Sequence, residues 1–365
     1  MKYREHKRTH DVISEIGFGS GELFASGMEE GVKTLRRAYE AGINYFDLAS
    51  GDGRTFPIWG EALSDVRDKV LYQIHFGADY TNNGAYGWTL DAETIKRSVD
   101  WQLKNLKTDY INFGFMHCQD EMKDWQKFRD GGAYAYLRKL QEEGVVHHLG
   151  LSSHTPAVAS AIMDEVPLDM LMFSVNAAYD YGSGEFAYGG ASEREDLYRR
   201  CEKEGIGISV MKPFSGGQLL SAAQSPFKKA LSPYQCIRYA LDRPGVLTVL
   251  PGIKNLEQLE SVLKYYELPE EETDYSVISS FVPEDAAGRC VYCSHCAPCP
   301  MEIDVGLVNK YYDLAKAGDP LAAEHYRTLR KNASDCIGCG HCDARCPFGV
   351  RGSERMQEIA SYFGA

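Results

Sequence analysis

Residues 336–347 read CIGCGHCDARCP, and a second cysteine-rich stretch, residues 290–300, reads CVYCSHCAPCP. The first of these has the spacing C-x2-C-x2-C-x3-C-P, with which small electron-transfer proteins hold [4Fe–4S] clusters. The other stretch differs only in having one residue fewer before its last cysteine. We therefore predict two [4Fe–4S] clusters whose ligands are eight of the eleven cysteines: Cys290, Cys293, Cys296, Cys299, Cys336, Cys339, Cys342 and Cys346.

The proline after each fourth cysteine turns the chain away from its loop. In two-cluster proteins with this spacing, the fourth cysteine is a ligand of the other cluster. We expect the first cluster to be held by Cys290, Cys293, Cys296 and Cys346, and the second by Cys336, Cys339, Cys342 and Cys299.

Other uses of cysteine fit these stretches less well. Disulfides need an oxidising compartment, whereas the charged N-terminus MKYREHKRTH lacks the apolar segment of a signal peptide, so we expect a cytoplasmic protein. Structural zinc uses two C-x2-C pairs and leaves a third spaced cysteine in each stretch unexplained. The remaining cysteines, Cys118, Cys201 and Cys236, are interpreted as core residues, with Cys118 pointing away from the side that His117 faces.

The overall charge and the hydropathy of the chain exclude two classes of partner. Acidic residues outnumber basic ones by 52 to 39, which gives a net charge of −13 and argues against nucleic acid. No apolar run approaches the roughly 18 residues that span a membrane. We therefore expect partners of another kind: a small-molecule substrate and an external electron carrier.

Residues 12–265 alternate short apolar runs with amphipathic stretches. The expected strands are Ile13–Phe18, Ile43–Phe46, Val70–Ile74, Tyr110–Phe115, Val146–Leu151, Met170–Phe173, Gly207–Val210 and Val246–Leu250. The helices expected between them include Gly31–Ala41, Ala92–Leu106, Tyr134–Glu143, Pro156–Asp164, Glu193–Glu204 and Pro233–Asp242. Eight such alternations predict an α/β fold, a (β/α)8 TIM barrel, with a doubly wound sheet as the alternative.

This pattern divides the chain into three parts. We expect the barrel in residues 1–265, a connector in residues 266–285, and a small, mostly helical ferredoxin-like iron–sulfur domain in residues 286–365. Within this last domain, helices are expected at Val305–Ala317 and Leu321–Asn332.

Polar residues follow the expected strands at the end where barrel enzymes place their chemistry. A single loop Asp or His has a structural explanation, such as a helix cap, but recurrence at successive strand ends favours one shared site. The acid–base candidates are Asp47, Asp52, His75 and His117, and the cofactor-binding candidates are Ser152, Ser153, His154, Asn176, Lys212, Gly252 and Lys254.

The same segments resemble the aldo-keto reductases. AGINYFDLAS (41–50), LKTDYINFGFMH (106–117) and VHHLGLSSH (146–154) are similar to three of that family's motifs, and both cysteine stretches match a ferredoxin-fused branch of it. The resemblance spans almost the whole chain. It implies an oxidoreductase that acts on carbonyl groups, with NADP(H) as the usual cofactor.

The family's carbonyl chemistry uses a Tyr as proton donor, a Lys and an Asp that tune its pKa, and a His that orients the carbonyl. The resemblance places Asp47 at the Asp position and His117 at the His position. Asp52 stands at the Tyr position and His75 at the Lys position, so two of the four groups are changed.

Two tyrosines of the next loop, Tyr80 and Tyr86, can reach the site, although nothing in the sequence requires it. The two carboxylates and two imidazoles of the acid–base set can exchange protons near neutral pH. A metal ion in the barrel, bound by the same four groups, is a weaker alternative.

Iron–sulfur clusters transfer single electrons, whereas a nicotinamide transfers a hydride. The first hypothesis is therefore an oxidoreductase in which electrons from a carrier such as a ferredoxin or flavodoxin pass through the clusters to a substrate or a flavin at the barrel mouth. The second is an NADPH-dependent carbonyl reductase with an altered tetrad and structural clusters. The third is a non-catalytic electron carrier or redox sensor.

Overall fold

The computed structural model describes all residues except 22, 279–287, 291, 293, 317–320 and 365. The chain divides into two compact units, each described here by itself. Unit 1 comprises Met1–Gly189 and Glu193–Thr273, and unit 2 comprises Gly190–Ser192 and Asp274–Ala365. Part of the expected connector, residues 279–285, lies outside the described residues.

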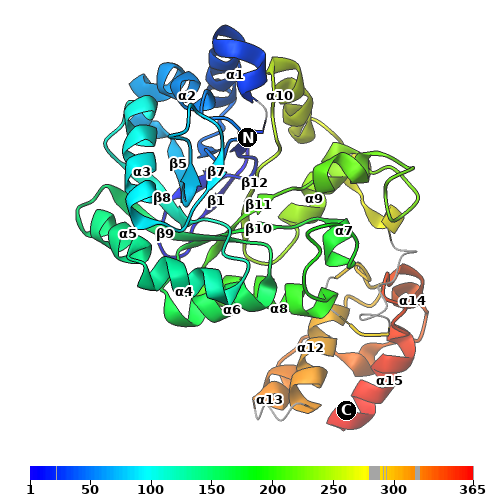
Figure 1. Cartoon of the computed structure of the whole chain (residues 1–365). Coiled ribbons are helices and arrows are strands. Elements are labelled where there is room, and N and C mark those ends of the chain that lie inside the picture. Colours follow the sequence, from blue (N-terminus) through cyan, green and yellow to red (C-terminus); the bar gives the residue numbers. More distant parts are fainter. Residues whose placement is uncertain (22, 279–287, 291, 293, 317–320, 365) are drawn as a thin grey trace. The chain divides into compact units, whose positions relative to one another are not determined.

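Unit 1 is a closed barrel of eight parallel strands, each paired with its neighbour in chain order (Figure 1). The last strand meets the first, because Gly17 N donates to Val249 O at 2.9 Å and Ile253 N donates to Gly19 O at 3.1 Å. This order confirms the (β/α)8 barrel and excludes the doubly wound sheet. The strands are β3 (Phe18–Gly19), β4 (Tyr45–Asp47), β5 (Leu71–Phe76), β8 (Ile111–Met116), β9 (Val146–Ser153), β10 (Met170–Ser174), β11 (Gly207–Met211) and β12 (Val246–Val249).

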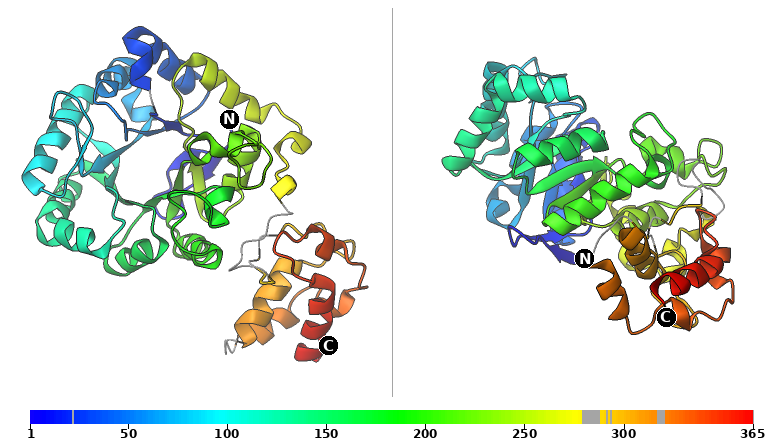
Figure 2. Two further views of the ribbon diagram at one scale, coloured as in Figure 1. Left: turned by 45° about the vertical axis from the view of Figure 1, so that its right-hand side comes forward. Right: turned by 90° about the horizontal axis from the view of Figure 1, so that it is seen from below.

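Helices form a ring outside these strands, as the left view of Figure 2 shows. They are α1 (Gly27–Glu40), α2 (Thr55–Leu63), α3 (Ala92–Leu106), α4 (Met122–Asp130), α5 (Ala133–Glu142), α6 (Pro156–Glu165), α7 (Ala177–Asp180), α8 (Ala191–Glu204), α9 (Pro233–Leu241), α10 (Leu256–Leu263) and α11 (Glu270–Thr273). No helix in the described part of the chain is long and apolar enough to cross a membrane.

Several helices begin at side chains that accept a hydrogen bond from an otherwise unpaired backbone N–H. Asp91 caps α3 in this way, and Asn255 caps α10. Ser232 and Gln235 form a reciprocal capping box at α9, which has Pro233 in its first turn. These local signals explain why the sequence predicted the starts of α3 and α9 well.

The expected strand Ile13–Phe18 is wrong as a single element. Val12–Ser14 (β2) pairs antiparallel with Tyr3–Glu5 (β1), whereas Phe18 pairs in parallel with Phe46 of the barrel. The apolar run therefore serves two different partner strands and turns between them. A second hairpin, β6 (Ala78–Asp79) with β7 (Gly87–Trp88), follows β5.

The inner face of the barrel is formed by alternate residues of each strand, because successive side chains point to opposite sides. Tyr45, Phe113, Phe115 and Met172 belong to one buried apolar cluster. Gly150 makes room for this packing, since a Cβ atom there would lie 2.5 Å from the Phe115 ring. The barrel interior is therefore a filled core, and chemistry is confined to its ends.

The described part of unit 2 contains four α-helices around a small core of its own. Tyr326 and Phe363 stack within it with ring centroids 3.9 Å apart, beside the buried side chains of Val308 and Ile359. The helix expected at Leu321–Asn332 is shorter than predicted. The helices are α12 (Val305–Lys316), α13 (Ala322–Arg327), α14 (His341–Arg345) and α15 (Gly352–Phe363).

Candidate functional site

A chain of four hydrogen-bonded side chains runs from β4 to the loop of the β6–β7 hairpin. Asp47 Oδ1 lies 2.8 Å from His75 Nε2, and His75 Nδ1 lies 3.0 Å from His117 Nδ1. His117 Nε2 lies 2.8 Å from the Tyr86 hydroxyl. The structure thus brings three predicted acid–base residues together and adds Tyr86 to them. Of the two tyrosines considered, Tyr80 bonds instead to the backbone of Ser50.

With both imidazoles neutral, one arrangement of protons satisfies every contact in this chain. His75 donates its Nε2–H to the Asp47 carboxylate, and His117 donates its Nδ1–H to His75 Nδ1. Tyr86 then donates its hydroxyl proton to His117 Nε2. Every proton points toward Asp47, so the chain can accept a proton at Tyr86 by shifting each proton one step inward.

Burial sets the electrostatics of this chain. His75 is 1 % exposed and Asp47 is 4 % exposed. Burial, followed by the charges of His75 and His154, lowers the pKa of His117 well below its ordinary value. Burial also raises the pKa of Tyr86 to about 12, although 44 % of this residue is exposed. The inner groups are shielded from water, whereas the residue at the outer end of the chain is nearly half exposed.

Gln73, which the sequence interpretation missed, holds the buried end of the chain. Its Nε2 donates to Asp47 Oδ1 at 3.1 Å, while its Oε1 accepts from the hydroxyl groups of Tyr45 at 2.6 Å and Ser209 at 3.1 Å. The sequence could have indicated Gln73, because it precedes His75 by two residues on one strand and its side chain therefore lies on the same face of that strand as His75.

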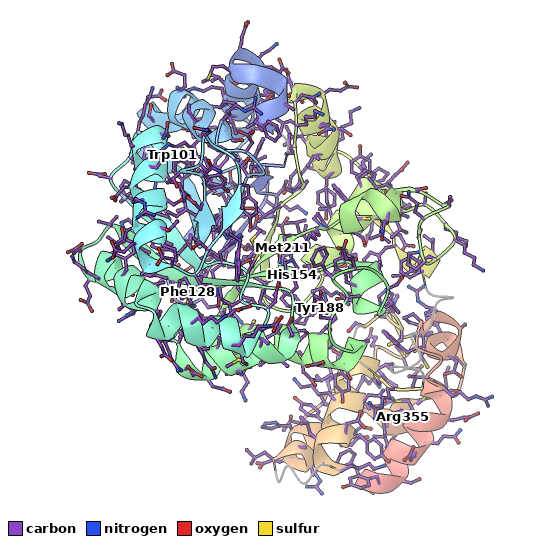
Figure 3. All side chains as sticks on the ribbon, viewed as in Figure 1. Trp101, Phe128, His154, Tyr188, Met211 and Arg355 are labelled. Carbon is purple, nitrogen blue, oxygen red and sulfur yellow. The ribbon has the colours of Figure 1, made fainter. Side chains whose placement is uncertain are left out.

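A second chain lies at the ends of β9 and β11. His154 Nδ1 lies 2.9 Å from Asp120 Oδ2, and His154 Nε2 lies 2.9 Å from Lys212 Nζ. The Phe186 ring covers both, at 3.3 Å from Lys212 Nζ and 4.7 Å between ring centroids from His154. Figure 3 labels His154 and Met211 within the barrel region. Asp120 was missed because a loop aspartate after a strand resembles a helix cap.

The pKa values of Lys212 and Asp120, the two ends of this second chain, are both lowered. Burial lowers the pKa of Lys212, against the smaller effects of Cys118, Asp120 and Glu185. Burial raises the pKa of Asp120, but its hydrogen bonds and charge interaction with His154 outweigh this, so its pKa is lowered. The chain therefore joins a stable carboxylate to a lysine that releases its proton more readily than usual.

The other predicted residues surround these chains or lie apart from them. Ser153 Oγ donates to Asp120 Oδ1 at 3.1 Å, and Asn176 Nδ2 donates to Lys212 O at 2.8 Å. Asp52 forms an ion pair with Arg54 at 2.7 Å. The remaining positions contribute backbone contacts: Ser152 O accepts from Gln119 N, Gly252 bridges to Gly19, and Lys254 N donates to Gln258 Oε1.

The orientation expected for Cys118 is wrong. β8 ends at Met116, and Cys118 has a φ of +48°, so the alternation of a strand no longer applies. Its Sγ lies 3.6 Å from His117 Nε2. Burial raises the pKa of this thiol to about 12, which leaves it protonated and weakly nucleophilic.

In unit 2, five of the expected cluster ligands line one cavity. Cys296 and Cys299 of the first stretch lie there with Cys336, Cys339 and Cys342 of the second, so the cavity contains ligands of both stretches and does not by itself decide the pairing. A Cβ atom on Gly352 would lie 2.7 Å from Cys342 Sγ, so the glycine leaves room beside the thiol. Four thiols with apolar surroundings fit a [4Fe–4S] cluster.

Two hydrogen bonds join the start of the first stretch to the end of the second. Gly288 N donates to Phe348 O at 2.7 Å, and Arg345 Nε donates to His295 O at 3.1 Å. They hold the segments of Cys290 and Cys346 together, while Cys293 lies outside the described residues. No three His, Cys, Asp or Glu side chains among the described residues have metal-site spacing. The fit to the clusters therefore rests on ligand type and the shared cavity.

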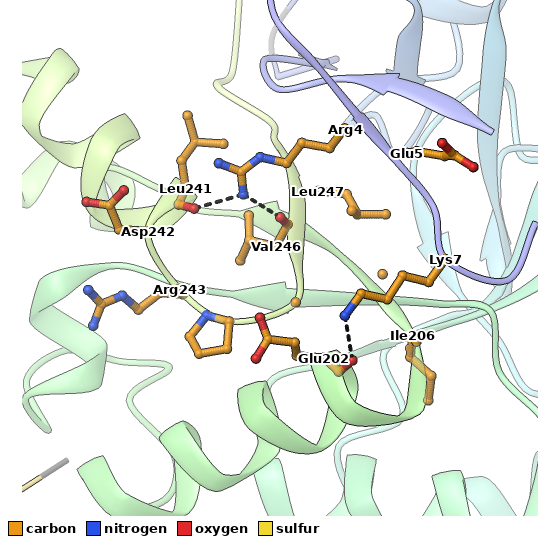
Figure 4. A pocket seen from close by; sticks show the side chains of 14 residues that line it. Arg4, Glu5, Lys7, Glu202, Ile206, Leu241, Asp242, Arg243, Val246 and Leu247 are labelled. Carbon is orange, nitrogen blue, oxygen red and sulfur yellow. Dashed lines mark hydrogen bonds between the residues drawn. The ribbon is translucent and has the colours of Figure 1, made fainter. Parts of the chain in front are cut away.

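A cavity of about 340 Å³ opens near the starts of β11 and β12, at the opposite end of the barrel (Figure 4). Two of its basic side chains are engaged with backbone carbonyls: Arg4 donates to Leu241 O and Val246 O, and Lys7 donates to Glu202 O. This arrangement ties the N-terminal hairpin to the barrel, and we assign no chemistry to it.

Comparison with known proteins agrees with the two-unit architecture. The aldo/keto reductase family matches residues 15–233, and a 4Fe-4S dicluster domain matches residues 286–350. L-galactose dehydrogenase of Arabidopsis thaliana is 25% identical over 280 residues, 68% of this chain and 82% of that protein. The uncharacterized oxidoreductase YqkF of Bacillus subtilis is 31% identical over 153 residues, 40% of this chain and 47% of its own length.

Solved structures show the same fold. The holo form of an aldo-keto reductase from Bacillus halodurans has a TM-score of 0.60 and 22% identity, and the match covers 75% of this chain and 94% of that one. A putative aldo-keto reductase from Pseudomonas aeruginosa has a TM-score of 0.56 and 23% identity, and the match covers 72% of this chain and 93% of that one. The chain is therefore an oxidoreductase that belongs to the aldo/keto reductase family and carries a 4Fe-4S dicluster domain after its barrel.

Proposed function

We propose that this protein interconverts a carbonyl and an alcohol group at the barrel mouth. The electrons pass one at a time between the substrate and two [4Fe–4S] clusters, whose ligands are the eight cysteines of the two cysteine-rich stretches. The observation that carries the proposal is the unbroken chain Asp47–His75–His117–Tyr86. It replaces the Tyr–Lys–Asp arrangement that the family resemblance leads one to expect, and it supplies a phenol where Asp52 stands at the Tyr position.

Tyr86 is the group that meets the substrate oxygen in this proposal. When an alcohol is oxidised, it loses two electrons, the hydroxyl proton and the proton of its C–H bond, and this second proton goes to an acceptor other than Tyr86. Tyr86 accepts the hydroxyl proton and passes its own proton to His117 Nε2. His117 then gives its Nδ1–H to His75, and His75 gives its Nε2–H to Asp47. Reduction reverses these steps. Because two imidazoles separate Asp47 from Tyr86, the Asp47 carboxylate can draw a proton from Tyr86 while it stays buried.

The clusters, when bound, supply or accept one electron each. In this proposal residues 1–265 are the catalytic barrel, residues 266–285 the connector and residues 286–365 the cluster domain. A carrier of the ferredoxin or flavodoxin class reduces the clusters, and either the substrate or a flavin accepts the electrons at the barrel mouth. The match of residues 286–350 to a 4Fe-4S dicluster domain and the separate compact unit that contains them support this division.

Anaerobic turnover with a chemical one-electron reductant tests the proposal. Dithionite-reduced protein is expected to reduce carbonyl compounds, and a variant with Cys336, Cys339 and Cys342 replaced by serine is expected to lose this activity. Wild-type rates with NADPH in that variant would contradict the proposal, because electrons would then bypass the clusters.

A second candidate is an NADPH-dependent carbonyl reductase in which the clusters stabilise the fold. Membership of the aldo/keto reductase family favours it, and Ser152, Ser153, Asn176, Gly252 and Lys254 would then contact the nucleotide. Titration with NADPH, followed by fluorescence, decides between the two. Absence of binding at millimolar NADPH removes this candidate.

A further inference from the structure

The chain Asp120–His154–Lys212 repeats the design of the first one, with a carboxylate, an imidazole and a terminal proton-bearing group. Its two contacts are both 2.9 Å long. His154 Nδ1–H donates to Asp120, so the neutral ring can accept only at Nε2, from Lys212. The proposed chemistry at Tyr86 does not use any of these three residues.

Lys212 is held in place with unusual firmness for a lysine. It has a φ of +53°, a left-handed conformation that non-glycine residues adopt at a cost of about 1–2 kcal/mol. Its carbonyl accepts from Asn176 Nδ2, and its Nζ lies 3.3 Å from the centre of the Phe186 ring. Strained residues at strand ends of this kind are common in functional sites.

The environment of Lys212 makes it a better acid than an exposed lysine. Burial lowers its pKa, and a lowered pKa increases the driving force for transfer of the ammonium proton to a substrate. His154 Nε2 accepts one of its N–H groups. The partly buried amine retains two further N–H bonds, one of which can point into the mouth.

The two chains serve the same end of the barrel. Cys118, which follows β8, lies between them: its Sγ is 3.6 Å from His117 Nε2, and the charges of Asp120 and Lys212 act on it. The charge of His154 acts on His117 in the same way. The two chains are therefore close enough for their charges to act on each other's members.

We propose that Lys212 is a second proton donor, which protonates carbon while Tyr86 protonates oxygen, and that the substrate is a conjugated carbonyl compound. This inference rests on the proposed function, because single electrons must arrive one after the other. Conjugation is required since the intermediate formed after the first electron must delocalise its unpaired spin.

The reaction balances with two electrons and two protons. For a 1,2-diketone it is R–CO–CO–R′ + 2 e⁻ + 2 H⁺ → R–CH(OH)–CO–R′. One C=O π bond is broken, and one O–H and one C–H bond form. An external one-electron reductant of the ferredoxin class is oxidised twice. Lys212, left as a neutral amine, regains its proton from solvent.

Two replacements of Lys212 separate proton donation from simple charge. Lys212→Met removes both, whereas Lys212→Arg keeps the positive charge but cannot release a proton near neutral pH. With 1-phenyl-1,2-propanedione and dithionite in D2O, the wild-type protein is expected to give one enantiomer with deuterium on carbon. Both variants should form that enantiomer about 100-fold more slowly, the usual size of a general-acid contribution.

The outcomes distinguish this inference from the function on which it rests. Wild-type rate and enantiomeric excess in Lys212→Arg would show that only the charge matters and would overturn the inference alone. Absence of turnover with the one-electron reductant, together with deuterium transfer from labelled NADPH, would overturn the proposed function and the inference with it.

A measurement without turnover gives an independent check. NMR titration of ¹³C-dimethylated lysines, with Lys212→Met to assign the signal, is expected to show a pKa for Lys212 below the ordinary lysine range. Asp120→Asn should lower it further, because one negative charge near the ammonium is lost. A Lys212 pKa in the ordinary range would overturn the inference.

Discussion

At the scale of single residues, the proposed mechanism differs from the family pattern in the groups that take up and supply the proton of the catalytic tyrosine. A lysine beside a tyrosine stabilises phenolate directly through its charge. Here His75 stands at that position, and the charge of Asp47 reaches Tyr86 only through two imidazoles. In the proposed mechanism the phenol is Tyr86, which comes from the β6–β7 hairpin later in the chain.

Replacement of Tyr86 by phenylalanine is expected to lower kcat for carbonyl reduction by about 100-fold or more, as loss of a general acid does. Stability should change little, because the side chain is 44 % exposed. The matched control is Tyr80→Phe. Its hydroxyl is buried and bonds to Ser50 O and Ser50 N, so its loss should cost about 1–3 kcal/mol of stability and leave kcat near the wild-type value. Equal kcat in the wild type and Tyr86→Phe would disprove the role of Tyr86.

The lowered pKa of His117 makes the stability of the fold depend on pH. In the unfolded chain a histidine titrates near pH 6.5. Below that pH the unfolded state binds a proton that folded His117 does not, so stability is complete above about pH 6.5 and falls as the pH decreases. The fall contributed by this residue is at most about 1.4 kcal/mol per pH unit.

Urea unfolding between pH 5 and pH 7 measures this effect. His117→Gln should flatten the profile by close to one proton's contribution. A profile for His117→Gln that is as steep as the wild-type profile would contradict the assignment of a neutral buried imidazole.

At the scale of elements, a buried ion network holds the segment between β10 and α8. Arg194, which is fully buried, donates to Asp180 Oδ1 at 2.8 Å and stacks on Phe173. The hydroxyl groups of Tyr198 and Tyr239 donate to the same carboxylate at 2.6 Å and 2.9 Å. This network anchors α7, next to the loop that places Phe186 over Lys212.

Arg194→Met leaves the Asp180 carboxylate without its cationic partner and is expected to cost about 3–5 kcal/mol of unfolding free energy. Lys139→Ala serves as control, because its ion pair with Glu143 is exposed and 3.6 Å long, and such pairs contribute about 0–1 kcal/mol. Urea denaturation measures both. Similar values for the two variants would show that the network does not stabilise the barrel.

At the scale of the whole molecule, the protein combines an aldo/keto reductase barrel with a 4Fe-4S dicluster domain. If the fourth cysteines exchange between clusters as proposed, each cluster is bound by both cysteine stretches. The two stretches then fold as one body around their metal centres, and neither cluster is held by a contiguous segment.

Single replacements of the fourth cysteines test this exchange. Cys299→Ser should destabilise the cluster of the second stretch, and Cys346→Ser that of the first, so each variant should retain about four of eight iron atoms. The double variant should lose most of its iron. Iron analysis with EPR of the reduced protein measures this. Cys299→Ser is expected to give the same EPR spectrum as Cys342→Ser, which loses the cluster of the second stretch, and a spectrum that matches Cys296→Ser instead would contradict the exchange.

The sequence by itself determined the barrel and the family, because both depend on patterns that repeat locally: apolar runs of strand length, helix caps such as Asp91, and motifs around Asp47 and His117. The cysteine spacing predicted the clusters for the same reason. The single strand predicted for residues 13–18 failed where one apolar run serves two partners, since pairing is decided by distant residues.

Only the tertiary structure decided which side chains meet. Tyr86 reaches His117 across 31 positions and Lys212 reaches His154 across 58, and neither distance leaves a periodic trace in the sequence. The two hydrogen-bonded chains form because the parallel strands bring their carboxyl ends to the same end of the barrel. The loops that follow these strands differ in length and contribute Tyr86 and Asp120. Local propensity fixes the strands, but closure of the barrel fixes their neighbours, and the chemistry depends on the neighbours.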